Sequence, residues 1–317
     1  MRKFCIVMPI IELSYLYVDG KREENAPTQE NNNFRRFFEI GGPFWHKYLV
    51  WKDLHSFIII LSEKQKATFI DMLESSVLAP YASKFDVRSQ EELLHDFGDE
   101  EQQKEWRKSR VQMMSKIAIA NHIPTEFYLI IDDDVILKRM FGYEDLFANK
   151  KTHRLRFTTA NAFHDYWWKG SMGFMQIDET KQAKLLKKLE TMKDHQKLLN
   201  VTPQIFVTQI ARDLYRYAGD SDDIMKTKNT WTEYTLYWLY MMLHVEGGPY
   251  KYYGVSKIRL SEDDLNIWFA VDDLENRIAK MMSSKHTYFC LIQSNIPSFS
   301  VELVKAALNK SHNHRII

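Results

Sequence analysis

Disulfide frameworks, long apolar runs and an excess of charge of either sign are all missing from this sequence of 317 residues. Its two cysteines, Cys5 and Cys290, lie inside apolar runs, which predicts buried thiols in a reducing compartment. No apolar run approaches the roughly 20 residues that a membrane-spanning helix needs. Lys and Arg number 43 against 42 Asp and Glu, so the net charge of +1 gives no global reason to expect a nucleic-acid partner. We therefore expect a cytoplasmic protein without a transmembrane span.

The residues that are present suffice for a large hydrophobic core, since 45% of them are hydrophobic and 14% aromatic. Apolar runs predict strands over Phe4–Ile11 and Phe57–Leu61, and a third, short strand is predicted over Lys84–Arg88. Between the second and third strands, Glu63–Ser76 has the apolar spacing of a helix, with Ser62 as its N-cap. Strand, helix and strand in this order are typical of parallel winding. We predict an α/β domain with a mostly parallel central sheet and helices on both faces.

The rest of the chain continues the mixed pattern and contains no repeat or linker. Further strands are predicted over Arg154–Thr159, Gly173–Ile177 and Tyr288–Ile292. Further helices are predicted over Glu100–Ala120, Glu179–Lys193, Trp231–His244 and Ser300–Leu308, and another is predicted to begin at Thr202 with Pro203 in its first position. We therefore predict a single domain over residues 1–317, with one half over 1–137 and a second over 138–317.

The stretch Phe127–Leu137, FYLIIDDDVIL, is the strongest functional signal. Its five apolar residues read as a strand buried on both faces, and the aspartates that follow would stand where open α/β sheets bind ligands. In an extended strand Asp132 and Asp134 share a face and Asp133 turns away. Two carboxylates this close favour a divalent metal between them, and oxygen ligands suit Mg²⁺ or Mn²⁺. The alternative interpretation is an acidic turn or helix cap.

A haloacid-dehalogenase-type hydrolase also begins from Asp-x-Asp after an apolar strand, but we rank that interpretation lower. That pattern needs Thr or Val where Ile136 stands, and it normally lies near the N-terminus.

The ordered set of motifs resembles the GT-A class of nucleotide-sugar glycosyltransferases, and more narrowly a little-characterised group of bacterial and viral proteins placed in that class. The resemblance is carried by Gln112 and Lys116, LIIDDDVIL at 129–137, VTPQ at 201–204, WTEYTLY at 231–237 and IQS at 292–294. It implies a Rossmann-like GT-A fold and the transfer of a hexose or pentose from a nucleoside-diphosphate sugar, in the cytoplasm of a bacterium or of a virus-infected cell. The middle aspartate departs from the usual small residue.

The resemblance also implies roles for individual residues on the donor side. Asp134 would bind Mn²⁺ or Mg²⁺ directly, Asp132 would share the metal or hold the ribose, and His286 would be a late metal ligand. Lys116 is the predicted diphosphate contact, with Gln112 on the same helix. The end of the first strand, Val7, Met8 and Pro9, would lie under the base and ribose.

An acceptor hydroxyl needs a general base, and two carboxylates are candidates. Glu233 begins an aromatic helix whose apolar surroundings could raise its pKa, although it is equally suited to the first turn as a capping acid. Asp165 is flanked by possible acceptor contacts. The predicted acceptor residues are His164, Trp167, Trp168, Thr202 and Gln204, of which at least one tryptophan is expected in the core.

Two other function classes remain open at this point. A nucleotidyltransferase of similar fold would usually have a glycine-rich phosphate loop after the first strand, whereas this chain has Ile10–Ser14, IIELS. A non-catalytic carbohydrate-binding protein would leave each motif with a purely structural role. The expected partners are a donor, with a UDP-sugar as the first choice, and a glycan or other hydroxyl acceptor; nucleic acid is not the expected partner.

Overall fold

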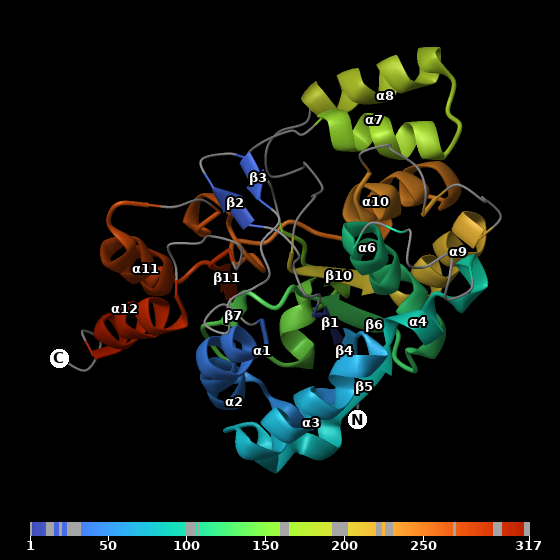
Figure 1. Ribbon diagram of the computed structural model, residues 1–317. Helices are drawn as coiled ribbons and strands as arrows, with labels where there is room; N and C mark the ends of the chain where they lie inside the picture. The colour runs from blue at the N-terminus through green and yellow to red at the C-terminus, as the bar shows by residue number, and fades with distance from the viewer. Residues whose placement is uncertain are drawn as a thin grey trace.

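The computed structural model describes residues 2–10, 16–18, 21–23, 33–98, 106, 108–158, 165–191, 202–219, 224–225, 231–268, 271–293 and 300–313. A five-stranded sheet lies at its centre (Figure 1). In spatial order its strands are β10 (Gln204–Val207), β6 (Phe127–Ile130), β1 (Phe4–Pro9), β4 (Leu54–Leu61) and β5 (Phe85–Ser89). The last four are parallel and β10 is antiparallel to β6. The prediction of a mixed α/β fold with a mostly parallel sheet is therefore confirmed.

Three small two-stranded sheets complete the β-structure of the described residues. They pair β7 (Val135–Leu137) with β11 (Phe289–Leu291), β2 (Leu16–Val18) with β3 (Lys21–Glu23), and β8 (Phe147–Asn149) with β9 (Arg154–Leu155). The sheet of β7 and β11 matters most for function, because β7 begins directly after the three aspartates.

Helices lie on both sides of the central sheet (Figure 1). On one side are α6 (Lys108–Ala118), α9 (Thr208–Gly219) and α10 (Glu233–His244), with α7 (Asp165–Phe174) and α8 (Glu179–Thr191) beyond them. On the other side are α1 (Asn33–Arg35), the π-helix η2 (Arg36–Gly41), α2 (Gly42–Tyr48) and α3 (Lys66–Ser75). Beside them stand α11 (Leu274–Ser283) and α12 (Val301–Asn313), and α4 (Gln90–Leu93) follows β5.

Short 3₁₀ helices connect these elements. They are η3 (Trp51–Asp53), η4 (Glu63–Gln65), η5 (Ala79–Lys84), η6 (His95–Phe97), η7 (Ile119–His122), η8 (Tyr143–Leu146), η10 (Pro249–Lys251) and η11 (Asp263–Leu265). None of the helices among the described residues is long and apolar enough to cross a membrane.

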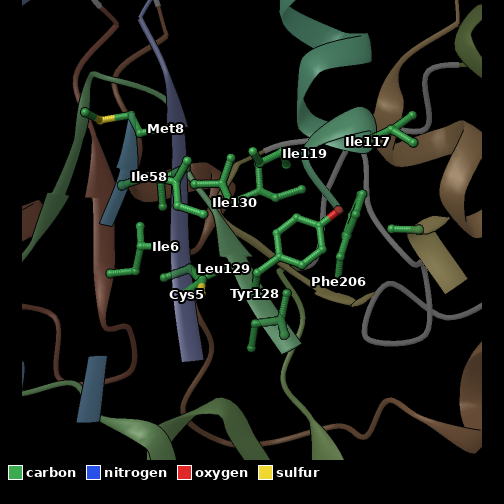
Figure 2. Close-up of a cluster of buried hydrophobic side chains, with 14 of the residues drawn as sticks. Cys5, Ile6, Met8, Ile58, Ile117, Ile119, Tyr128, Leu129, Ile130 and Phe206 are labelled. Carbon is green, nitrogen blue, oxygen red and sulfur yellow. The ribbon is translucent and has the colours of Figure 1, made fainter. Parts of the chain in front are cut away.

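The hydrophobic core is built around β1, all of whose residues are buried. Figure 2 shows Ile6 and Met8 of this strand among side chains of the neighbouring strands, including Ile58 of β4 and Ile130 of β6. A strand in the middle of a parallel sheet is covered on both faces, which is why its sequence is apolar throughout. The core joins side chains from before and after residue 137, while the predicted division into two halves stays a prediction.

Two predicted elements are wrong. A strand was predicted over Gly173–Ile177, but α7 ends only at Phe174, and Trp168, Met172 and Met175 are buried at the i, i+4, i+7 spacing of a helix face. The helix predicted to begin at Thr202 is absent from this described stretch, where β10 pairs with β6 after a cis Thr202–Pro203 peptide. The helix begins only at Thr208, as α9. Pairing with β6 has outweighed the local capping signal.

Candidate functional site

The three aspartates stand at the C-terminal end of β6, between β1 and β10 in the central sheet. The backbone N–H of Ile131 donates to the carbonyl oxygen of Val7 at 3.0 Å, which continues the pairing with β1 by one residue. The backbone N–H of Asp132 then donates to Oγ1 of Thr202, also at 3.0 Å. These contacts fix the point at which the chain leaves the sheet.

The chain turns at Asp133 and Asp134 before β7 begins, and the N–H of Val135 donates to the carbonyl oxygen of Asp132 at 3.2 Å. The alternation of a straight strand ends at this turn. Asp132 faces α6, whereas Asp133 and Asp134 both line a small pocket with Arg36. The prediction that Asp133 turns away is therefore wrong, because its side chain is buried in the same pocket as that of Asp134.

Lys116 of α6 is the centre of the first charged cluster. Its Nζ lies 2.6 Å from Oδ1 of Asp132, 2.5 Å from Oε1 of Glu233 and 3.2 Å from the hydroxyl of Tyr234. The Lys116 and Glu233 side chains are each only 3% exposed. Burial alone would lower the pKa of Lys116, but the two carboxylates outweigh it and hold the pKa well above its usual value. Lys116 is therefore a charged group inside the protein.

The sequence supports this cluster locally at each of its helices. Gln112 and Lys116 are four residues apart on α6, so they share a face, and Nε2 of Gln112 is 3.5 Å from Oδ1 of Asp132. Helix α10 begins at Glu233, and a hydrogen bond from the N–H of Thr235 to Oγ1 of Thr232 caps it. Tyr234 was missed by the sequence argument; burial raises the pKa of its hydroxyl well above the usual value, so it stays protonated.

Arg36 is the centre of the second charged cluster, on the other side of the aspartates. It begins the π-helix η2, is 2% exposed, and donates from Nη2 to the carbonyl oxygens of Ile292 at 3.0 Å and Gln293 at 3.5 Å. Burial lowers the pKa of Arg36, while Asp134 and Asp133 oppose that change. Burial and the repulsion of Asp134 and Asp132 raise the pKa of Asp133 well above its usual value. An arginine inside the aromatic run FRRFFEIGG is the signal that could have identified this residue.

The residues of the first strand that were predicted to lie under the nucleotide are part of the hydrophobic core. Val7 and Met8 are at most 1% exposed and Pro9 is buried, so contacts from their side chains to a nucleotide are not what the structure shows. Lys116, predicted to contact a diphosphate, already has three partners. Gln112 and Asp132 lie together as described above.

The structure does not bring His286 to the aspartates. It is exposed and precedes β11, which runs antiparallel to β7 with Leu291 opposite Val135 and Phe289 opposite Leu137. Asp134 therefore stands at one end of this pair of strands and His286 beyond the other end. Within the ranges that the structure describes, no group of three or more His, Cys, Asp or Glu side chains is arranged as metal ligands.

The predicted acceptor residues are distributed more widely. Trp168 is 2% exposed and belongs to the core, as expected of at least one tryptophan, whereas Trp167 is half-buried beside α10. Thr202 binds the backbone of Asp132, and the fully buried Gln204 donates to the carbonyl oxygen of Thr158 at 3.5 Å. Asp165 is the first residue of α7, and His164 lies outside the described residues.

Comparisons with known proteins concern the architecture. Mouse xyloside xylosyltransferase 1 in its apo form is similar with a TM-score of 0.47 and 9% identity, over 93% of this chain and 99% of that chain. The galactosyltransferase LgtC, in complex with donor and acceptor sugar analogs, is similar with a TM-score of 0.44 and 10% identity, over 97% and 96%. The mannosyltransferase Ktr4p from S. cerevisiae is similar with a TM-score of 0.42 and 9% identity, over 75% and 65%. These three are glycosyltransferases, and the likeness is one of fold.

No curated protein matches the chain in sequence. Residues 31–313 match a family of unknown function, DUF6492, and because this range is most of the chain, the protein belongs to that family.

Proposed function

We propose that the protein is a metal-dependent glycosyltransferase that moves a sugar from a nucleoside-diphosphate sugar to a hydroxyl group of an acceptor. The observation that carries this proposal is the position of three aspartates at the C-terminal end of β6, beside β1. Ligands of open α/β sheets bind at this edge, and carboxylate oxygens suit Mn²⁺ or Mg²⁺. The resemblance of the sequence to GT-A enzymes supports the reaction type.

The balance of charge in the site favours a divalent cation. Two cationic side chains accompany four carboxylates in the two clusters, namely Lys116 and Arg36 with Asp132, Asp133, Asp134 and Glu233. Two negative charges are left over within this group when all are ionised, and one is left when Asp133, whose pKa is raised by burial, keeps its proton. Oδ2 of Asp133 is also buried without a hydrogen-bond partner among the described residues, and such an atom favours a bound cation or donor.

The residues that would hold the metal are Asp134 and one neighbour. Asp132 has Oδ1 engaged by Lys116, so it would supply Oδ2, either to the metal or to the ribose of the donor. The metal would act as a Lewis acid that stabilises the negative charge of the diphosphate leaving group. Oδ2 of Asp132 and the carboxylate of Asp134 would then orient the donor, and the charge of Arg36 would reduce the repulsion among the acids.

We propose that the acceptor approaches from the side of α7 and α10. Trp167 would support a sugar ring there, and His164 is a further proposed contact. Thr202 and Gln204, predicted as acceptor contacts, are buried and bind the backbone of Asp132 and Thr158 instead. Asp165 is the proposed base that takes the hydroxyl proton. Glu233, the other candidate from the sequence, is buried and bound to Lys116. A UDP-sugar and a glycan acceptor are the first choices.

A thermal-shift panel of UDP-, GDP-, CDP- and dTDP-sugars, each with and without Mn²⁺, tests this function. A ligand that binds the native state raises the melting temperature by mass action, about 2.7 kcal/mol of stabilisation at 100 times its Kd. We expect a shift with one nucleotide and only with metal. Asp134→Asn should abolish it, while the surface control Asp71→Asn should keep it. No shift with any donor would refute the proposal, and pyrophosphate release from a nucleoside triphosphate would indicate a nucleotidyltransferase instead.

A further inference from the structure

Glu233 occupies a different position from the one a general base requires. Its Oε1 is 2.5 Å from Nζ of Lys116, which is in turn 2.6 Å from Oδ1 of Asp132. The three side chains therefore form a carboxylate–ammonium–carboxylate bridge that joins α10, α6 and the end of β6. A base must be within hydrogen-bond reach of the proton that it removes, and Glu233 is 3% exposed and already engaged.

The bridge uses every donor that Lys116 has. An ammonium group carries three N–H bonds, and Asp132, Glu233 and the Tyr234 hydroxyl are three acceptors. No N–H is left for a phosphate. The charge of Lys116 therefore acts on the site through Asp132.

Hydrogen bonds fix the position of the two chain segments that carry Glu233 and Asp132, the two ends of the bridge. Capping by Thr232 fixes the start of α10, and a 2.8 Å hydrogen bond between the hydroxyls of Ser171 and Thr235 ties this start to α7. The Asp132 N–H is bound by Thr202. Among the described residues, Lys116 and Gln112 both contact the Asp132 carboxylate through Oδ1, and the Asp132 side chain is 24% exposed. Oδ2 is thus the oxygen that a ligand could reach.

We infer that Glu233 is a positioning residue, which holds Lys116 so that Lys116 fixes Asp132 with its Oδ2 directed to the bound metal or donor. This inference rests on the proposed function and assigns Glu233 within it. It leaves Asp165 as the candidate for the base.

The test compares two substitutions of Glu233 in calorimetric titrations with Mn²⁺ alone. Glu233→Gln keeps an oxygen that accepts from Lys116, whereas Glu233→Leu removes it. We expect Glu233→Leu to weaken Mn²⁺ binding about tenfold or more and Glu233→Gln to stay within about threefold of the wild type. If both variants are inactive and both keep the Mn²⁺ affinity of the wild type, the inference is overturned, because this is the result expected when Glu233 is the base.

The variant Lys116→Met distinguishes the effect of Lys116 on the position of Asp132 from the effect of its positive charge on cation binding. Loss of a positive charge would by itself tighten the binding of a cation, whereas loss of the bridge should weaken it. We expect weaker Mn²⁺ binding, and we expect Glu233→Leu to add nothing further when Lys116 is already methionine. Tighter binding, or additive effects, would contradict the bridge.

A matched control lies one turn further along α10. Tyr237 is fully buried, and its hydroxyl accepts from the N–H of Val207 at 2.9 Å, away from Lys116. Tyr237→Phe should leave Mn²⁺ affinity unchanged, while Tyr234→Phe should lower it modestly. Urea midpoints for all variants show which of them are folded.

Crystal structures of the metal-free variants distinguish failure of this inference from failure of the proposed function. If the wild type binds no Mn²⁺, the metal-dependent function is refuted, but the bridge can still be examined. The Asp132 carboxylate should keep its orientation in Glu233→Gln and change it in Glu233→Leu. An unchanged Asp132 in Glu233→Leu would overturn the inference whatever the protein binds.

Discussion

Replacing Lys116 by methionine should destabilise the protein far more than the loss of one hydrogen bond. The lysine and methionine side chains have similar length, so little packing is lost. The substitution does leave Asp132 and Glu233 as neighbouring carboxylates without a counter-ion. Breaking a buried ion pair by removing one partner costs about 3–5 kcal/mol. We place Lys116→Met in this range because Glu233 is almost completely buried, at 3% exposed, although the 24% exposure of Asp132 relieves part of the penalty.

Urea unfolding followed by circular dichroism measures this change, with the slope checked for two-state behaviour. Lys305→Met is the matched control, because its Nζ is also 2.6 Å from a carboxylate, that of Glu39, but the two side chains are 40% and 31% exposed. We expect the control to lose less than about 1 kcal/mol. The double variant Lys116→Met/Glu233→Gln should recover part of the lost stability, since it also removes the buried, unpaired charge of the Glu233 carboxylate. Equal losses in Lys116→Met and the control would refute the reasoning.

Other perturbations test other parts of the structure. Arg36→Gln should cost about 1.5–3 kcal/mol in urea unfolding, because it removes the buried charged donor that binds the carbonyl oxygen of Ile292, while the adjacent Arg35→Gln, whose partners are at the surface, should cost much less. Phe206→Ala should cost about 3–5 kcal/mol, since Phe206 is fully buried and stacks on Tyr237 with ring centroids 3.8 Å apart; a smaller loss would mean that the stack is not formed. Burial raises the pKa of the Cys290 thiol to about 12, so the folded state keeps this proton where the unfolded chain, with a pKa near ~8.5, loses it. The stability gained in this way is complete below pH ~8.5 and is lost as the pH rises to about 12, so the difference in stability between wild type and Cys290→Ala should shrink over this range, by up to ~1.4 kcal/mol per pH unit. A difference that does not change with pH would contradict the assigned burial.

The sheet could be predicted from the sequence because its strands have local signatures. Phe4–Ile11 and Phe57–Leu61 are continuous apolar runs, and the structure has β1 and β4 there, both covered on two faces. Ser62 was predicted as an N-cap, and its side chain binds that of Gln65 at the start of η4. Such signals depend only on residues close in the chain.

Elements that depend on distant partners could not be predicted in the same way. Gln204–Val207 becomes a strand because β6 offers it an edge, 70 or more residues away, and no local pattern records that edge. The helix α7 was mistaken for a strand over its last residues because Gly170 and Gly173 weaken the helical pattern, whereas packing against α10 through Ser171 and Thr235 decides the outcome.

The candidate site shows the same limit more sharply. Lys116 and Glu233 could each be selected from the sequence as residues of the site, but they are 117 positions apart, and nothing in the sequence says that they bind each other. Their contact changes the predicted roles of both, from phosphate contact and base to parts of one bridge. Arg36 was missed because the carbonyl oxygen that it binds belongs to Ile292, 256 positions away.

The three consecutive aspartates are chemically unequal because the chain turns within them. Asp132 is still in line with β6 and meets the cation of α6, whereas Asp133 and Asp134 lie past the bend and meet the cation of η2. Each of the two cations therefore screens a different part of the acidic cluster. Because Lys116 and Arg36 are themselves buried and bound to fixed acceptors, Lys116 through Nζ and Arg36 through Nη2, neither can move in to neutralise the remaining carboxylate oxygens. The negative charge that remains is thus confined to the turn, where an incoming divalent ion would be the mobile partner.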